Sequence, residues 1–326
     1  MAVYQIDEVG GWDRNLLVDV VIPVLNEQET LPELARRLDP ILDSLDGPSE
    51  VVLVDDGSTD ASFEIMRSLS DADPRYVVVR LTRNFGHQMA ISAGLEHASG
   101  DAVIIMDADL QDPPEVVLAL VDKWREGFQV VYAVRDERTG ESRTKLATAR
   151  WFYRVLGRMS DVEIPRDAGD FRLVDRRVVD TVNAMPEHRR YLRGMFAWVG
   201  YDQVGVRYVR EARHAGVTKF PMRRMLAFAA DGIVSFSTVP LRLVMMLGFF
   251  VSFVSVLAAG FGVVAKIASF DVVPGWASIV VPMGIIGGVQ LVVLGVIGEY
   301  IARIYDEVKQ RPLYLVREVV RSDTRP

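Results

Sequence analysis

The chain has 326 residues, half of them hydrophobic, and it carries a net charge of −7 without a single cysteine. This length accommodates one sizeable domain and a smaller one, and the lack of cysteine excludes disulfides and thiolate metal sites. Residues 1–14 are polar and contain no apolar core of a signal peptide, so we expect the bulk of the protein to stay in the cytoplasm.

Charge is unevenly distributed along the chain. Residues 1–142 hold 11 Lys and Arg against 28 Asp and Glu, whereas residues 143–242 hold 19 against 10. An acidic region followed by a basic region and then by apolar runs suggests docking on an anionic membrane surface. Basic helices that are simply solvated are the alternative.

The first 135 residues alternate short apolar runs with helical patterns. Strands rich in β-branched residues are predicted at 17–24, 50–54, 76–81 and 102–106. Helices are predicted at 29–45, 62–69 and 88–98. The alternation predicts an α/β fold with a mainly parallel sheet flanked by helices, whose site lies beyond the carboxyl ends of the strands.

Basic residues and apolar side chains are mixed in the next part of the chain. Residues 145–159 place Arg150, Arg154 and Arg158 on one stripe, and residues 220–237 have a similar mixture. Such amphipathic helices suit the headgroup region of a bilayer. Packing against the sheet is an equal alternative for the first of them.

Two apolar runs follow, at 243–265 and 276–297, and neither contains a charged side chain. At 1.5 Å rise per residue, either run spans a hydrocarbon core of about 30 Å. Lys and Arg precede the first run and follow the second, but none lies in the loop 269–275. The positive-inside rule therefore predicts a multi-pass inner-membrane protein with both termini in the cytoplasm.

The resulting organisation has four parts. We expect a catalytic domain at 1–215, an amphipathic membrane-interface segment at 216–242, two transmembrane helices at 243–298 and a cytoplasmic tail at 299–326.

Two carboxylates form the strongest local signal for chemistry. Asp107 and Asp109 come directly after an apolar strand, and residues at i and i+2 of a strand project to the same side. With room for water and diphosphate oxygens, such a pair suits Mg²⁺ or Mn²⁺. The metal would neutralise charge on a departing nucleoside diphosphate. Carboxylates that only cap a turn are the alternative.

Two further turns follow predicted strands. Val54-Asp55-Asp56-Gly57-Ser58 offers a carboxylate that can accept the imide N–H of uracil, although Asp and Ser also cap turns of this kind. Ile22-Pro23-Val24-Leu25-Asn26-Glu27 runs from a strand into a turn that can hold the nucleoside.

These motifs occur in the order seen in a known family. The sequences at 22–27, 54–58, 83–87 (Arg-Asn-Phe-Gly-His) and 107–115 (Asp-Ala-Asp-Leu-Gln-Asp-Pro-Pro-Glu) resemble inverting glycosyltransferases of family 2, which have the GT-A fold. More narrowly, the chain resembles polyprenyl-phosphate glycosyltransferases, such as dolichol-phosphate-mannose synthases and bacterial undecaprenyl-phosphate glucosyltransferases. The likeness continues through 167–173, 190–194, 240–242 and 294–303, and the two C-terminal spans favour the bacterial branch.

The resemblance implies a role for each of several residues. Contacts with the nucleotide sugar are implied for Pro23, Glu27, Asp55, Asp56, Asp107, Ala108 and Arg135, and metal binding for Asp107, Asp109 and Gln111. Lipid-phosphate binding is implied for Arg193, Arg213 and Lys219, and a catalytic role for Asp109, Asp170 and Arg193. Lys219 ends a Gly-Val-Thr-Lys sequence that departs from the usual Gly-Glu-Ser-Lys pattern.

The chemistry of the acceptor bears on the role of Asp170. A phosphate monoester has a second pKa of about 6, so at neutral pH it is mostly a dianion that scarcely needs a base. The harder tasks are to bring two anions together and to stabilise the leaving diphosphate. Asp170 is the base candidate by resemblance, and orienting the phosphate or a sugar hydroxyl is at least as plausible a role.

The resemblance, together with the apolar spans, thus implies transfer of a sugar, with glucose as the first choice, from a UDP-sugar to polyprenyl (undecaprenyl) phosphate on the cytoplasmic leaflet. The resemblance also implies a homo-oligomer, a tetramer, and we expect no nucleic-acid partner. A processive polysaccharide synthase is the first alternative, but the chain lacks a Gln-x-x-Arg-Trp motif and has two predicted spans. A catalytically silent membrane scaffold of the same fold is the second.

Overall fold

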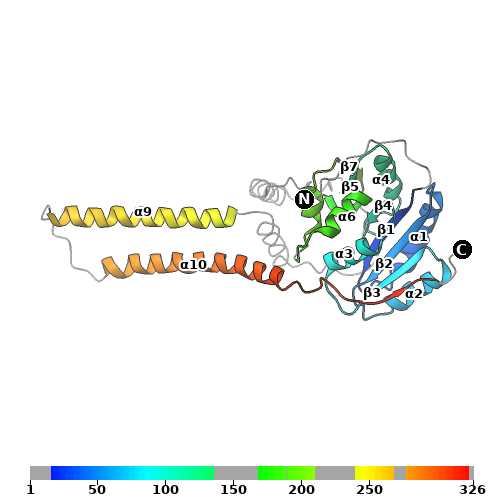
Figure 1. Cartoon of the computed structure of the whole chain (residues 1–326), viewed down its shortest axis with the longest axis horizontal. Helices are drawn as coiled ribbons and strands as arrows, with labels where there is room; N and C mark the ends of the chain where they lie inside the picture. Colours follow the sequence, from blue (N-terminus) through cyan, green and yellow to red (C-terminus); the bar gives the residue numbers. More distant parts are fainter. Residues whose placement is uncertain (1–15, 136–167, 189, 210–238, 268–276, 323–326) are drawn as a thin grey trace. The chain divides into compact units, whose positions relative to one another are not determined.

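The computed structural model describes residues 16–135, 168–188, 190–209, 239–267 and 277–322 (Figure 1). Arg213, Lys219, the two amphipathic segments and the loop 269–275 lie outside these ranges. The described residues fall into two units, of which one holds the sheet with its helices and the other holds the two long C-terminal helices.

An eight-stranded sheet in the order β7-β5-β6-β4-β1-β2-β3-β8 forms the centre of the first unit. Its strands are β1 (Val18–Val24), β2 (Ser49–Asp55), β3 (Tyr76–Leu81), β4 (Ala102–Ile105), β5 (Val130–Arg135), β6 (Ala168–Asp175), β7 (Gln203–Tyr208) and β8 (Val316–Val320). Strands β1 to β4 are parallel, whereas β6 and β8 run antiparallel to their neighbours. The predicted α/β fold with a mainly parallel sheet is therefore confirmed.

Among the described residues, six helices accompany the sheet: α1 (Leu31–Ser44), α2 (Ser62–Ala72), α3 (His87–His97), α4 (Val116–Arg125), α6 (Arg176–Ala184) and α7 (Leu192–Trp198). The first three match the helices predicted at 29–45, 62–69 and 88–98. Every residue of β1 and β4 is buried, as expected of central strands covered on both faces. In α1 the buried Leu31, Leu34, Leu38 and Leu42 recur at helical spacing and form part of the hydrophobic core.

The parallel strands bring three turns to one edge of the sheet. β1, β2 and β4 are neighbours in register; β1 and β2 end within the motifs at 22–27 and 54–58, and β4 ends just before the motif at 107–115. Gly57 in the turn after β2 has φ 72°, and a Cβ there would lie 2.6 Å from the backbone of Arg83 and Asn84. Only glycine accommodates both the left-handed backbone and that close approach.

The chain returns to the sheet after the long helices. β8 pairs with β3 with Arg80 opposite Glu318, and the carbonyl of Leu315 accepts the backbone N–H of Thr82 at 2.9 Å. Figure 1 shows this strand, in red, beside β3. The segment that we expected to be a tail, 299–326, therefore contains a strand of the eight-stranded sheet.

The second unit contains α9 (Val239–Ile267) and α10 (Ala277–Val308), which contact one another. Among the residues that the structure describes, one segment is long and apolar enough to cross a membrane, Pro282–Val308 of α10. Two spans were predicted, and this criterion supports one of them. α10 also continues past the predicted end at residue 297, where Glu299 and Arg303 form an i,i+4 ion pair of 3.1 Å.

Candidate active site

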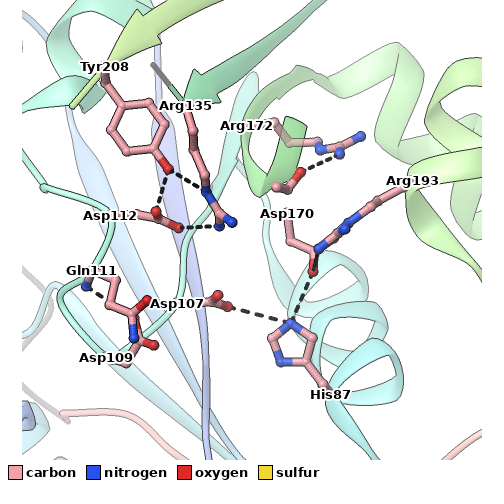
Figure 2. Close-up of polar contacts among 11 residues, drawn as sticks. His87, Asp107, Asp109, Gln111, Asp112, Arg135, Asp170, Arg172, Arg193 and Tyr208 are labelled. Carbon is pink, nitrogen blue, oxygen red and sulfur yellow. Dashed lines mark hydrogen bonds and ion pairs between the residues drawn. The ribbon is translucent and has the colours of Figure 1, made fainter. Parts of the chain in front are cut away.

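Asp107 and Asp109 lie at the edge of the sheet, in the turn after β4 (Figure 2). Leu110 has φ 57°, a conformation that is unusual for a leucine, and the backbone N–H of Gln111 donates to Asp109 Oδ1 at 3.1 Å. The sharp turn brings the side chains of Asp109 and Gln111 beside one another, with Asp107 on the strand side (Figure 2).

The environment of Asp107 fits a cation. Its Oδ1 is buried and accepts no hydrogen bond from the residues that the structure describes. Burial raises the pKa of Asp107 to about 6, with the nearby Asp170 and Asp109 adding to the effect and His87 opposing it. A divalent ion would satisfy the oxygen and offset the repulsion between the carboxylates. No group of three His, Cys, Asp or Glu side chains suited to a metal occurs in the described ranges.

Asp170 is held by an arginine and a histidine from two other elements. Arg193 of α7 donates from Nε to Asp170 Oδ1 at 2.6 Å and from Nη2 to Oδ2 at 3.0 Å. Nε2 of His87, at the start of α3, lies 3.4 Å from Asp170 Oδ2 and 3.5 Å from Asp107 Oδ1. His87 therefore stands between the predicted metal ligand and the predicted base (Figure 2).

These contacts determine the protonation of the cluster. Burial alone would raise the pKa of Asp170, but His87 and Arg193 outweigh it and hold that pKa well below its usual range. Burial lowers the pKa of His87, and the two carboxylates more than reverse the effect. Because a carboxylate with so low a pKa is a weak proton acceptor, these contacts favour the orienting role of Asp170 over that of a base.

Arg135 belongs to a second polar group beside the first. Its Nε donates to the hydroxyl of Tyr208 at 3.1 Å, and its Nη2 lies 3.7 Å from Oδ2 of the buried Asp112. The Tyr208 hydroxyl in turn donates to Oδ1 of Asp112, which joins β7 to the turn after β4. A Cβ at Gly169 would lie 2.9 Å from Arg135 Nη2, so the glycine leaves room for this guanidinium.

The turn after β2 is held mainly by hydrogen bonds from the chain itself. The oxygens of Asp56 accept the backbone N–H groups of Phe85 at 2.7 Å and Gly86 at 3.0 Å. Asp55 is fully buried, and its Oδ1 accepts the N–H of Ser58 at 2.8 Å. Both carboxylates thus act on the backbone, and Asp56 fixes the segment that delivers His87.

The remaining predicted nucleotide contacts lie on or near β1 and β4. Pro23 is buried opposite Val54 in the sheet, and Ala108 is buried between the two metal-ligand candidates. Glu27 is half-buried and accepts a hydrogen bond from the hydroxyl of Thr30 at 2.8 Å.

The structure therefore brings most of the predicted residues to one edge. Asp107, Asp109, Gln111, Asp170 and Arg193 gather there, and Arg213 and Lys219 lie outside the described residues. Sequence reasoning assigned no role to His87, Asp112 or Tyr208. His87 ends a motif that contributed to the family resemblance, and that was the one available signal for it.

Comparison with known proteins identifies the family. Residues 19–182 match glycosyl transferase family 2. An uncharacterized glycosyltransferase of Bacillus subtilis, YkcC, is 45% identical over 305 residues, 94% of each chain. The SfII prophage-derived bactoprenol glucosyl transferase of Shigella flexneri is 40% identical over 306 residues, 94% of this chain and 99% of its own.

Solved structures are more distant. The chain is similar to glucosyl-3-phosphoglycerate synthase from Mycobacterium tuberculosis in complex with Mn²⁺, UDP and phosphoglyceric acid, with 23% identity, a TM-score of 0.47, and coverage of 70% of this chain and 82% of that one. The matched domain and the relatives that extend over nearly the whole length place this chain in glycosyltransferase family 2.

Proposed function

We propose that the protein transfers a sugar from a UDP-sugar to polyprenyl phosphate, with inversion at the anomeric carbon, and that glucose is the sugar. One observation carries the proposal: Asp107, whose buried Oδ1 accepts no hydrogen bond from the described residues, lies within one cluster with His87 and the Asp170–Arg193 pair. The bactoprenol glucosyl transferases that match nearly the whole chain support the choice of acceptor and sugar.

The donor would bind over the turns after β1, β2 and β4. Asp107, Asp109 and Gln111 would hold Mg²⁺ or Mn²⁺ against the diphosphate, where the ion would offset the charge that develops on the leaving group. Asp56 and the turn after β2 would place the nucleoside, and Pro23 and Glu27 would border it.

The acceptor would bind on the side of Arg193. At neutral pH its phosphate is already mostly ionised, so the protein's task is to position the attacking oxygen. Arg193, fixed by its two hydrogen bonds to Asp170, can present its remaining N–H groups to a phosphate. Arg213 and Lys219 would add positive charge there. Asp170 stays ionised and orients its neighbours.

The membrane part of the proposal depends on the C-terminal helices. α10 carries a segment fit to cross a bilayer, and α9 exposes large apolar side chains, among them Phe249, Phe253 and Phe261. We propose that both helices span the membrane and that the sheet faces the cytoplasm, where the lipid phosphate of the inner leaflet is accessible. The tetramer implied by resemblance stays a prediction.

The test is a transfer assay with the full chain. The purified protein is incubated with labelled UDP-sugars one at a time, Mn²⁺ and undecaprenyl phosphate, and lipid-linked label is extracted. We expect label from UDP-glucose, its loss in Asp107→Ala, and its retention in Asp122→Ala, a matched exposed aspartate on α4. Absence of labelled lipid with every donor would refute the transferase proposal, and release of a long polymer would favour a processive synthase.

A further inference from the structure

The turn after β2, residues 55–58, is tied to the neighbouring strand by a buried charge pair. Oδ2 of Asp55 lies 3.2 Å from Nε of Arg80 on β3, and the Asp55 side chain is fully buried. The other oxygen of the same carboxylate accepts the N–H of Ser58 at 2.8 Å. One carboxylate thus joins Arg80 to this turn, which we call the nucleotide turn.

Hydrogen bonds also link the nucleotide turn to the turn that follows β1. The hydroxyl of Ser58 accepts the backbone N–H of Asn26 at 3.1 Å, and Oδ1 of Asn26 accepts the N–H of Thr59 at 2.8 Å. Asn26 itself has φ 57°, so these hydrogen bonds hold a backbone conformation that few residues adopt without support. A shift of Asp55 would therefore disturb both turns that border the proposed nucleoside site.

Arg80 is itself held on two further sides. Its guanidinium lies over the ring of Phe63 in α2, 3.8 Å from the centroid. Its Nη1 is 3.4 Å from Oε1 of Glu318, the residue opposite it on β8. A planar, permanently charged guanidinium can satisfy all three contacts together, whereas a lysine would offer a single point charge.

We propose that Arg80 is a positioning residue for the nucleotide turn and that Glu318, on the strand that follows the long apolar helices, holds Arg80 in place. This inference rests on the proposed function, because it takes the nucleotide turn to bind the UDP moiety. It gives β8 a part in donor binding, although β8 lies outside residues 19–182 that match the family.

The Arg80–Asp55 and Arg80–Glu318 contacts differ in burial, and burial determines the size of the effect expected from losing each. Removal of Arg80 leaves the charge of Asp55 buried without its cation. Because this is energetically costly, we expect the nucleotide turn to move so that the Asp55 carboxylate reaches water. The affinity for UDP should then fall about tenfold, which corresponds to about 1.4 kcal/mol. The Arg80–Glu318 pair is partly exposed, so loss of Glu318 should weaken binding only about twofold to fivefold.

The experiment measures UDP binding to the full chain in detergent by calorimetry with Mn²⁺, together with the kcat and the donor KM. Arg80→Gln, Arg80→Lys and Glu318→Gln are compared with Arg317→Gln, an exposed charge on the same strand. We expect Kd and KM to rise in the first three, kcat at saturating donor to stay within about twofold, and Arg317→Gln to match the parent. The double variant Arg80→Gln/Glu318→Gln should bind like Arg80→Gln alone, because Glu318 acts through Arg80.

The outcomes separate the two proposals. A parent protein that binds no UDP contradicts the proposed function. A parent that binds UDP and an Arg80→Gln variant that binds it equally well contradict this inference alone, as does full additivity in the double variant. If Arg80→Gln does not fold, Arg80→Lys and Glu318→Gln decide the question, and unchanged affinity in both overturns the inference.

Discussion

The turns after β2 and β4 both present two acidic residues at the same edge of the sheet, yet they use them differently. Asp56 gives both oxygens to backbone N–H groups, and Asp55 is neutralised by Arg80. Oδ2 of Asp55 and Oδ1 of Asp107 are both buried without a hydrogen bond from the described residues, but their charged neighbours differ. Oδ2 of Asp55 lies 3.2 Å from Nε of the permanently charged Arg80, whereas Oδ1 of Asp107 lies 3.5 Å from Nε2 of His87, which is charged only when protonated. Carboxylates in equivalent places thus either build the site or are left for a ligand, and their charged partners distinguish the two uses.

The largest expected effect comes from the carboxylate left for the ligand. Asp107→Asn should lower kcat about 10³-fold or more, because it removes a charged ligand of the ion that stabilises the leaving diphosphate. The thermal unfolding midpoint should not fall, since the change also removes a repelled buried charge. Transfer assays and thermal scans on Asp107→Asn and Asp122→Asn check this prediction. A large loss of stability would instead show that Asp107 stabilises the fold, as Asp55 and Asp56 do.

At Asp56 we expect the opposite result, in which a substitution lowers the stability of the fold. Asp56→Asn replaces one acceptor oxygen by an amide that faces a backbone donor, so the free energy of unfolding should fall by about 2 kcal/mol. A midpoint lower by several degrees, measured without nucleotide, is the expected result. If stability were unchanged while UDP affinity collapsed, Asp56 would be a ligand-binding residue and the contrast between the two turns would fail.

pH offers a way to sharpen the same contrast. The pKa of Asp107 is raised to about 6, above its value in the unfolded chain, so the folded metal-free protein binds more protons between about pH 4 and pH 6. Stability from this group is therefore present at low pH and is lost as the pH rises through 6. We expect the parent to lose about 1–2 kcal/mol more than Asp107→Asn between pH 5 and pH 7 in the presence of a chelator. Parallel pH profiles for the two proteins would contradict the prediction.

The smallest effect concerns the link between the turns after β1 and β2. Ser58→Ala removes the acceptor for the N–H of Asn26, which lies at the exposed edge where water can replace it. The cost should be about 1 kcal/mol or less, and the donor KM should rise a few-fold. A matched change at the exposed Ser68 of α2, whose hydroxyl donates to a helix carbonyl, should leave KM unaltered.

Much of the first half of the fold follows from the sequence. β1 to β4 are apolar runs separated by amphipathic helices, so the hydrophobic periodicity and the length of each segment are enough to identify them. β6 was not predicted because its sequence, Ala-Gly-Asp-Phe-Arg-Leu-Val-Asp, contains four charged or glycine positions whose burial depends on neighbours. Arg172 within it is buried, and it donates to the carbonyl of Gly169 at 2.8 Å. Such pairing cannot be deduced from local pattern.

Site residues could be predicted where they belong to one short segment of sequence, but not where the site is formed by residues from separate elements. The i, i+2 spacing after a strand predicts the Asp107 and Asp109 pair. The Asp170–Arg193 pair joins β6 to α7, and no periodicity in the sequence predicts that these two elements are in contact. His87 was given no role because the motif at 83–87 marked the resemblance only as a whole, and the contacts of His87 with Asp107 and Asp170 depend on two other elements. β8 was predicted to be part of a tail because it is five residues long with two adjacent charged residues, and its partner strand lies more than 200 positions earlier.

The position of β8 in the chain also has a consequence for how the protein is made. During synthesis, β3 leaves the ribosome long before β8, so the edge of β3 has no β8 to pair with until α9 and α10 have been translated. An unpaired edge is a template for association with other chains, and domains generally fold as they emerge, N-terminal part first. Because β8 follows α9 and α10 in the chain, the β3 edge of the sheet can be completed only after both long helices have been synthesised.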